Sequence, residues 1–294
     1  MKDSKELSIC VYTGIFGAYE SQLYPPPPDT DESIIGEECC HIEYVCFADK
    51  TSISSGISNI SKKWQIVDIG DDFGMRALEF CGNLDQIAQN MTVHEPIANS
   101  IAIRAFPKLL PFPKKDDDDD VDILIYVDAN VVIGSFTVLQ NMIRAGKDAD
   151  ASLVFSKHPN RNCIYSEMSE SATYLKYHNN HWERQRTSYR EQKVPGNAGM
   201  LWNGLCVFLS PFQRDLDDWG KRYFFESMNP LFVRDITQRF HAQGQVTLCK
   251  VFCDLGIMPT KCDRDEDNNN LVCFVPIISQ GPGLKNGINQ ERHG

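Results

Sequence analysis

Two oxygen-bearing side chains, Asp128 and Asn130, stand one residue apart at the end of an apolar run. The run, Ile123 to Val127, is rich in β-branched and aromatic residues and has the length of a fully buried strand. Carboxylate and amide oxygens are the kind of ligand that Mg²⁺ and Mn²⁺ bind, and open α/β sheets bind ligands beyond the carboxyl ends of their strands. The pattern therefore predicts a metal site at Asp128 and Asn130. A plain Asx-type turn after the strand is the alternative.

Other polar groups also follow apolar runs. Gly14 to Tyr19 comes directly after Leu7 to Thr13, and its glycines permit a tight turn against which a nucleotide base and ribose can lie. A plain strand-to-loop turn fits these residues equally well. Asp49 ends the run Ile42 to Phe47, where its carboxylate can accept hydrogen bonds from a ribose or a base, or cap a turn.

Positively charged and titratable groups are a third candidate set. His158 and Arg161 follow the predicted strand Ala151 to Phe155. Lys285 follows the segment Gly281 to Gly283, whose backbone can approach a diphosphate, although a polar turn is the favoured interpretation there.

The elements that must position these groups alternate between strand and helix patterns. Further strands are predicted at Trp64–Ile69, Met200–Leu209 (a strand pair around Asn203-Gly204), Val246–Phe252 and Leu271–Ile278. Helices are predicted at 75–89, 96–106, 136–145, 166–192, 213–228 and 233–240, and solvated loops at 51–63 and 116–120. With no internal repeat and no clear linker, the pattern predicts one α/β domain.

Composition narrows the class further. The 294 residues carry a net charge of −11, which argues against a general nucleic-acid binder. No segment has the length of a membrane span and no secretory signal is visible, so we expect a soluble, cytoplasmic chain. Eleven scattered cysteines, an odd number, favour reduced thiols over disulfides.

Several motifs now form an ordered series. They are VYTGIFGAY (11–19), YVCFAD (44–49), RAFPKLLP (104–111), IYVDAN (125–130), HPNRNCIY (158–165) and VRDITQ (233–238). In order and spacing the series resembles the GT-A-type glycosyltransferase-like family that includes the plant MUCI-type mucilage and pectin proteins. The resemblance covers the chain from Val11 to about Phe240.

The resemblance implies a GT-A-like, Rossmann-like fold: a mixed, mostly parallel central sheet flanked by helices in a single domain, 1–294. Residues 1–135 would form the nucleotide-sugar half and 136–294 the acceptor half. The implied activity is transfer of a hexose or pentose from a nucleoside-diphosphate sugar, first among them a UDP-sugar, to a glycan or glycoprotein hydroxyl, with Mn²⁺ or Mg²⁺.

Individual residues carry over where the motifs match. Asp128-Ala129-Asn130 matches the family's D-G-N, and the whole resembles the metal-binding D-x-D of such enzymes. The remaining donor contacts expected within the motifs are Thr13, Phe16, Gly17, Tyr19, Asp49, Arg104, Lys108 and His158. Lys285, expected beside Gly281 to Gly283, lies beyond the stretch that the resemblance covers. Phe112 and Ile236 depart from the family pattern, which bears on acceptor and donor choice.

The chemistry of such a transfer assigns roles. Negative charge develops on the leaving nucleoside diphosphate, and a cation on Asp128 with Lys108 and Arg161 nearby would stabilise that charge. Asp235 is the candidate base for an inverting reaction. Its alternative role is that of a helix-start carboxylate complementing the helix dipole.

Two other functions remain open from the residues alone. The D-x-N variant fits an inactive carbohydrate-binding or scaffold protein with the same fold. A sugar nucleotidyltransferase shares the strand-end metal chemistry, but no glycine-rich triphosphate loop supports it.

Overall fold

The computed structural model describes residues 7–16, 18, 20–26, 34–35, 38–59, 62–69, 121–174, 180–197, 200–209, 222–223, 226–227, 244–255, 260–261 and 271–274. Its strands are β1 (Leu7–Ile15), β2 (Gln22–Leu23), β3 (Ile34–Ile35), β4 (Glu38–Ala48), β5 (Ser58–Asn59), β6 (Gln65–Asp68), β7 (Ile123–Val127), β8 (Leu153–Lys157), β9 (Leu201–Leu209), β10 (Thr260–Lys261) and β11 (Leu271–Phe274). Its helices are α1 (Lys50–Ser54), α5 (Phe136–Asp148), α6 (Ile164–Ser171), α7 (Trp182–Glu191) and α9 (Gly244–Asp254). None of these helices is long and apolar enough to cross a membrane.

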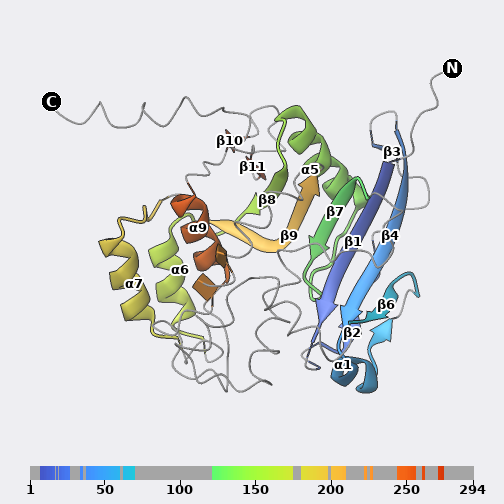
Figure 1. The fold of residues 1–294 in the computed structure, drawn as a ribbon, viewed down its shortest axis with the longest axis horizontal. Coiled ribbons are helices and arrows are strands. Elements are labelled where there is room, and N and C mark those ends of the chain that lie inside the picture. Colours follow the sequence, from blue (N-terminus) through green and yellow to red (C-terminus); the bar gives the residue numbers. More distant parts are fainter. Residues whose placement is uncertain are drawn as a thin grey trace.

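One large sheet holds most of the described strands. Its order is β10-β11-β8-β9-β7-β1-β4-β3, and β6 also pairs with β4 (Figure 1). β1 pairs in parallel with both β4 and β7, and β4 pairs in parallel with β6. β9 is antiparallel to both of its neighbours, β7 and β8. β6, β4, β1, β7, β8 and β10 therefore all run in the same direction.

The centre of this sheet confirms the predicted fold class. Taken across the sheet, the strands β6-β4-β1-β7-β9-β8 combine a parallel, Rossmann-like half with a reversed strand, β9, next to β8. Helices flank the sheet, so the architecture is a mixed α/β, GT-A-like fold. The division into halves 1–135 and 136–294 stays a prediction.

α5 covers one face of the sheet. Its buried Leu139, Met142 and Ile143 belong to a cluster with Val11, Ile125, Val154 and Val207, which are neighbours across β1, β7, β8 and β9. Each of these helix side chains contributes about 1.5–3 kcal/mol relative to an exposed position. The helix begins at Ser135, whose hydroxyl accepts a hydrogen bond from the N–H of Thr137.

On the opposite face of the sheet, a row of mostly aromatic side chains crosses the same strands. Tyr12, Tyr126, Cys206 and Phe155 are neighbours in register across the same strands, and all are buried. Phe155 packs edge-on against Phe252 of α9, with ring centroids 6.0 Å apart. Because Val154 and Phe155 are consecutive on β8, α5 and α9 cover opposite faces of the sheet. α6 and α7 stand beside α9, at the same end of the sheet (Figure 1).

The predicted late strand Val246–Phe252 is wrong, because this segment forms helix α9. Its residues from Val246 to Phe252 are all buried, including Thr247 and Lys250, so the apolar run shows neither helical nor strand periodicity clearly. The helix contacts both β9 and α6.

The chain between Met200 and Leu209 is one strand and not the predicted strand pair. β9 pairs with the end of β8 through Leu201 and Trp202, and then with β7 and β8 through Leu205 to Leu209. Asn203-Gly204 lies at the irregularity between these two parts. A Cβ on Gly204 would stand 2.9 Å from the Trp202 ring, so this close approach requires glycine.

Two local predictions also need correction. The segment 51–63, expected as a plain loop, contains α1 and β5, because the Asp49 side chain caps α1. Gly14 lies inside β1, so the turn begins later than predicted, after Phe16. The seven cysteines whose side chains are described form no disulfide, and their redox state stays a prediction.

Candidate functional site

The topology places one reversal of strand order at β1. From β1 the chain proceeds outward through β4 to β6 and then returns to β7 on the other side of β1. Ligands of open α/β sheets bind beyond the carboxyl ends of the two strands at such a switch point. β1 ends at Ile15 and β7 at Val127, so Asp128, the first residue after β7, lies at this position.

Asp128 is held on both its backbone and its side chain. Its N–H donates to the carbonyl oxygen of Gly204 at 2.8 Å, which ties the end of β7 to β9. Its Oδ1 accepts a hydrogen bond from the Tyr126 hydroxyl at 2.5 Å. Burial, and then the Asp128 carboxylate, raise the pKa of Tyr126 well above its usual value, so the phenol stays protonated and remains the donor.

The residues that follow Asp128 differ in exposure. Ala129 is half-buried and packs against the cluster of Ile15, Leu23 and Cys46, which joins the ends of β1 and β7. Asn130 is exposed in the turn, and the N–H of Val131 closes that turn on the carbonyl of Asp128 at 2.9 Å. The predicted metal ligands thus follow the end of β7 directly, with Asp128 half-buried and Asn130 exposed.

A hydrogen bond joins the chain after β1 to helix α1. Ala18 has a left-handed backbone (φ 52°), and its N–H donates to the Ser52 hydroxyl at 3.0 Å. Asp49 accepts from the N–H of Ser52 at 2.8 Å as the N-cap of α1. The capping alternative for Asp49 is therefore present in the structure, and its predicted role in donor binding stays a prediction.

Thr13 and Phe16, the other described donor-contact candidates at this edge, are both buried. The Thr13 hydroxyl has no hydrogen-bond partner within the described residues, although it is 1% exposed. Such an unsatisfied buried hydroxyl is unusual in a folded protein. Their predicted roles in donor binding stay predictions.

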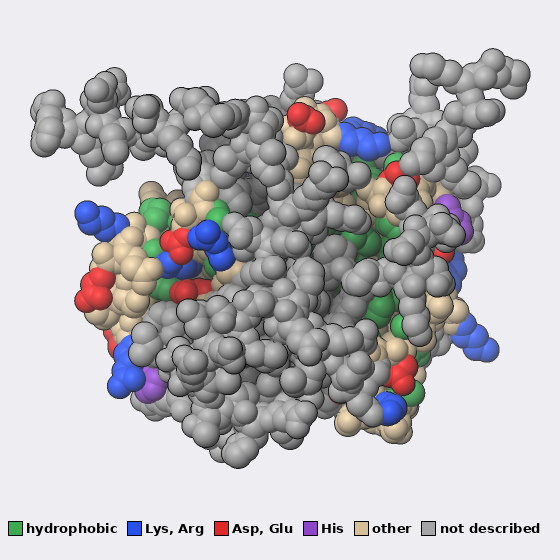
Figure 2. All heavy atoms as spheres, viewed as in Figure 1, with side chains coloured by type: hydrophobic (Ala, Val, Ile, Leu, Met, Phe, Trp, Pro, Cys, Tyr) green, Lys and Arg blue, Asp and Glu red, His purple; other side chains and the backbone are tan. Residues whose placement is uncertain are grey.

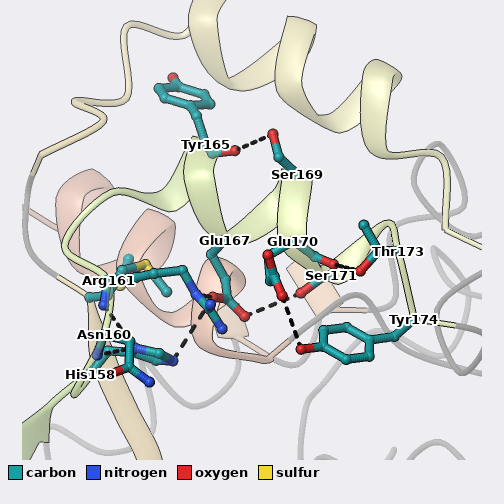
Figure 3. Close-up of polar contacts among 12 residues, drawn as sticks. His158, Asn160, Arg161, Tyr165, Glu167, Ser169, Glu170, Ser171, Thr173 and Tyr174 are labelled. Carbon is teal, nitrogen blue, oxygen red and sulfur yellow. Dashed lines mark hydrogen bonds and ion pairs between the residues drawn. The ribbon is translucent and has the colours of Figure 1, made fainter.

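His158 and Arg161 come together with a third residue at the end of β8. Arg161 pairs through its Nε with Oε2 of Glu167, a nearly fully buried residue of α6 (Figure 3). The His158 Nε2 lies 3.9 Å from the same carboxylate oxygen, and Ser171 donates to the other oxygen, Oε1, at 3.2 Å. We call His158, Arg161 and Glu167 the Glu167 cluster.

The orientation and charge of His158 follow from its surroundings. Its Nδ1 accepts hydrogen bonds from the N–H groups of Asn160 (3.2 Å) and Arg161 (3.1 Å), so the proton of the neutral ring is on Nε2, facing Glu167. Burial lowers the pKa of His158 below its usual value; Glu167 opposes this shift and Arg161 adds to it. The imidazole is therefore neutral near pH 7.

The other predicted site residues lie outside the described residues. These are Gly17, Tyr19, Arg104, Lys108, Asp235 and Lys285. Their predicted roles stay predictions.

Tyr126 and Glu167 were missed by reasoning from the sequence. Tyr126 lies two residues before Asp128 on a strand, hence on the same face, which is a usable signal. Glu167 lies on the buried face of α6 with Ile164, Met168 and Ser171, at helical spacing. A carboxylate therefore stands among residues that are shielded from water. A buried carboxylate demands a cationic or hydrogen-bonding partner, but the spacing does not say which residue supplies it.

The strand end fits a Mg²⁺ or Mn²⁺ ion that is bound partly by substrate. Within the described residues no three His, Cys, Asp or Glu side chains gather as a complete metal site. Mg²⁺ bound with a phosphorylated substrate commonly uses only one or two protein carboxylates and fills its other positions with phosphate and water. Asp128 meets this requirement, with Tyr126 orienting its carboxylate as outer groups orient metal ligands.

Comparison with known proteins identifies no sequence relative: no family model and no curated protein matches the chain. Among solved structures, the crystal structure of mouse xyloside xylosyltransferase 1 in its apo form is similar at a TM-score of 0.40 and 10% identity. The match covers 84% of this chain and 82% of that one. At this distance the likeness says nothing about activity, and the fold assignment rests on the strand order and direction described above.

Proposed function

We propose that the protein is a metal-dependent glycosyltransferase. It moves a hexose or pentose from a nucleoside-diphosphate sugar, with UDP-sugars the favoured donors, to a hydroxyl of a glycan or glycoprotein. The observation that carries this proposal is the position of Asp128: a carboxylate, oriented by Tyr126, beyond the carboxyl end of β7 at the switch point of a GT-A-like sheet.

The residues of the chain divide the task. Asp128, with Asn130 beside it, would hold Mn²⁺ or Mg²⁺, which when bound offsets the negative charge that develops on the leaving diphosphate. The predicted Lys108 would supply positive charge for the same transition state, and Arg161 would contact the diphosphate or the sugar. The chain after β1, where the Ala18 N–H donates to the Ser52 hydroxyl of α1, would lie against the nucleoside.

Deprotonation of the acceptor hydroxyl is the remaining step, and Asp235 is the proposed base. If transfer inverts the anomeric configuration, Asp235→Asn keeps donor binding and lowers turnover by about 10²–10⁴-fold. Product configuration read by NMR tests this role directly. Retention of configuration, or near-normal turnover in the variant, excludes Asp235 as the base.

The decisive experiment is a thermal-shift screen of UDP-, GDP- and CMP-sugars, with and without Mn²⁺. A ligand that binds only the native state raises the melting temperature by mass action. We expect a Mn²⁺-dependent rise with a nucleoside-diphosphate sugar, followed by donor hydrolysis or transfer on incubation. Binding without any turnover would indicate the inactive carbohydrate-binding alternative, and no binding in the whole screen would refute the proposal.

Asp128→Asn is the matching variant, because an amide oxygen can still accept the Tyr126 hydrogen bond while the charge is lost. Asp122→Asn is its control on the same strand: Asp122 lies at the opposite end of β7, where Oδ2 accepts from the Ser8 N–H at 2.9 Å. The Mn²⁺-dependent shift should disappear in Asp128→Asn and persist in Asp122→Asn. An unchanged Mn²⁺ requirement in Asp128→Asn would show that the metal binds elsewhere.

A further inference from the structure

Arg161 uses only part of its hydrogen-bonding capacity inside the protein. Nε pairs with Glu167, whereas the two terminal nitrogens of the guanidinium make no hydrogen bond within the described part of the chain. The side chain keeps 25% of its surface exposed. Because the guanidinium is planar, the bond at Nε fixes the direction in which the terminal N–H donors point. Figure 3 shows Arg161 and His158 lying together, with both side chains directed at Glu167.

The charge of this group decides what it can bind. The Glu167 carboxylate balances the guanidinium, and the third member, His158, is neutral near pH 7. An approaching diphosphate gains most from positive charge that no nearby anion offsets. Sugar hydroxyls need directed donors rather than net charge, and a guanidinium fixed at Nε supplies them. The cluster is therefore better suited to hydroxyl groups than to a diphosphate.

Two backbone hydrogen bonds to different points along β9 place the cluster away from the metal-site candidate. The N–H of His158 donates to the carbonyl of Met200, just before β9, whereas the N–H of Asp128 donates to Gly204 within it. These anchor points are four residues apart, which is roughly 13 Å along an extended strand. β8 and β7 also lie on opposite sides of β9. A diphosphate held at Asp128 would therefore leave the Glu167 cluster to the next part of an extended donor, the sugar.

We propose that Glu167 is a positioning residue that fixes the Arg161 guanidinium so that its terminal N–H groups bind hydroxyls of the transferred sugar, while the diphosphate is bound at Asp128. This inference rests on the proposed function and assigns the sugar subsite within it. Ser171 donates a hydrogen bond to the other carboxylate oxygen of Glu167 and so helps to hold the carboxylate in place.

The test compares binding of a nucleotide with binding of the corresponding nucleotide sugar. Isothermal titration of the full chain with Mn²⁺ uses UDP and a UDP-sugar, or the GDP pair if the screen selects it. In Glu167→Gln we expect UDP affinity within about twofold of wild type, and a loss of UDP-sugar affinity of about 10–100-fold, as for loss of hydrogen bonds to a charged group. Arg161→Lys keeps the positive charge but loses the planar guanidinium and its fixed N–H donors, so it should show the same selective loss.

The matched control is Glu183→Gln on α7, where Glu183 pairs with Arg186 at 2.6 Å on the surface. It should change neither affinity. If Glu167→Gln does not fold, Arg161→Lys carries the test alone. Equal weakening of UDP and UDP-sugar would make this a diphosphate contact, and unchanged affinities in folded variants would make it purely structural; either result overturns the inference. Wild type that binds neither ligand refutes the proposed function itself, a result visible before any variant is made.

Discussion

Two carboxylates at the same edge of the sheet differ in their burial and in the partner that binds them. Asp128 follows the central strand β7, is half-buried, and accepts a hydrogen bond from a neutral phenol. Glu167 lies on α6 beyond the end of β8, is 3% exposed, and pairs with a guanidinium. The described partner of Asp128 is thus a neutral hydroxyl, whereas the partner of Glu167 is a cationic guanidinium.

The difference teaches which carboxylate is suited to an external cation. A charge that an internal guanidinium already balances has little left to offer a metal ion, but it holds its partner in place. A hydroxyl that donates to a carboxylate orients it, as outer groups orient the ligands of metal ions. On the visible face around α6 and α7, acidic and basic side chains are interspersed and form no patch of one sign (Figure 2).

The largest expected effect comes from breaking the buried pair. Arg161→Ala leaves the Glu167 carboxylate buried without its cation, which should cost about 3 kcal/mol in the free energy of unfolding. Arg186→Ala removes the cation that pairs with Glu183 on α7. Because the Glu183 side chain is 81% exposed and stays solvated without its partner, loss of this pair should cost under about 1 kcal/mol. Urea denaturation measures both. Equal losses would remove the distinction drawn above for Glu167.

Tyr126→Phe should weaken Mn²⁺ binding by about 10–100-fold, because it removes the group that orients the Asp128 carboxylate. Tyr12→Phe is the matched control: Tyr12 is the neighbour of Tyr126 in register, is equally buried, and has a hydroxyl without a partner among the described residues. Electron paramagnetic resonance of free Mn²⁺ gives both affinities. The orienting role is refuted if the two variants bind Mn²⁺ alike.

Asp128→Ala should cost about 1–2 kcal/mol of stability, because the buried Tyr126 hydroxyl loses its acceptor. The double variant with Tyr126→Phe also removes the unsatisfied hydroxyl donor, so it should recover most of the lost stability. Asp128→Asn should stay close to wild type. Additive losses in the double variant, followed by thermal unfolding, would show that the two side chains are not coupled.

His158 gives the smallest effect, in the acidic range. Its folded-state pKa is lowered, so between that value and the usual pKa of about 6.5 the unfolded chain binds more protons than the folded one. The contribution of His158 to stability is therefore complete above about pH 6.5 and is lost as pH falls through the lowered pKa. Stability measured from neutral to acidic pH should fall less steeply in His158→Gln than in wild type. A steeper fall in the variant would mean that the pKa is raised instead.

Local sequence was enough to predict the element that carries the site. Ile123 to Val127 is a strand with the predicted bounds, and Asp128 follows it at the carboxyl end. The predicted strands at β1, β4 and β6 and the helix at α5 also form, because their apolar patterns are local and unambiguous. The fold class followed from the ordered motifs and is confirmed by the strand order.

Tertiary structure alone decided the rest. Periodicity could not distinguish α9 from a strand, because a segment buried all round shows no polar face. The Asn203-Gly204 pair resembles a hairpin turn, but pairing with β8 and β7 in succession keeps β9 a single strand. The partner of Glu167 and the neighbour of β7 at the switch point are long-range choices, made by strand pairing and helix packing. The sequence by itself determined which side chains have the chemistry for the candidate site. Only the fold decided that Glu167 is buried against Arg161 and that Asp128 is half-buried beside Tyr126 at the strand end, because burial and neighbours depend on contacts between distant segments.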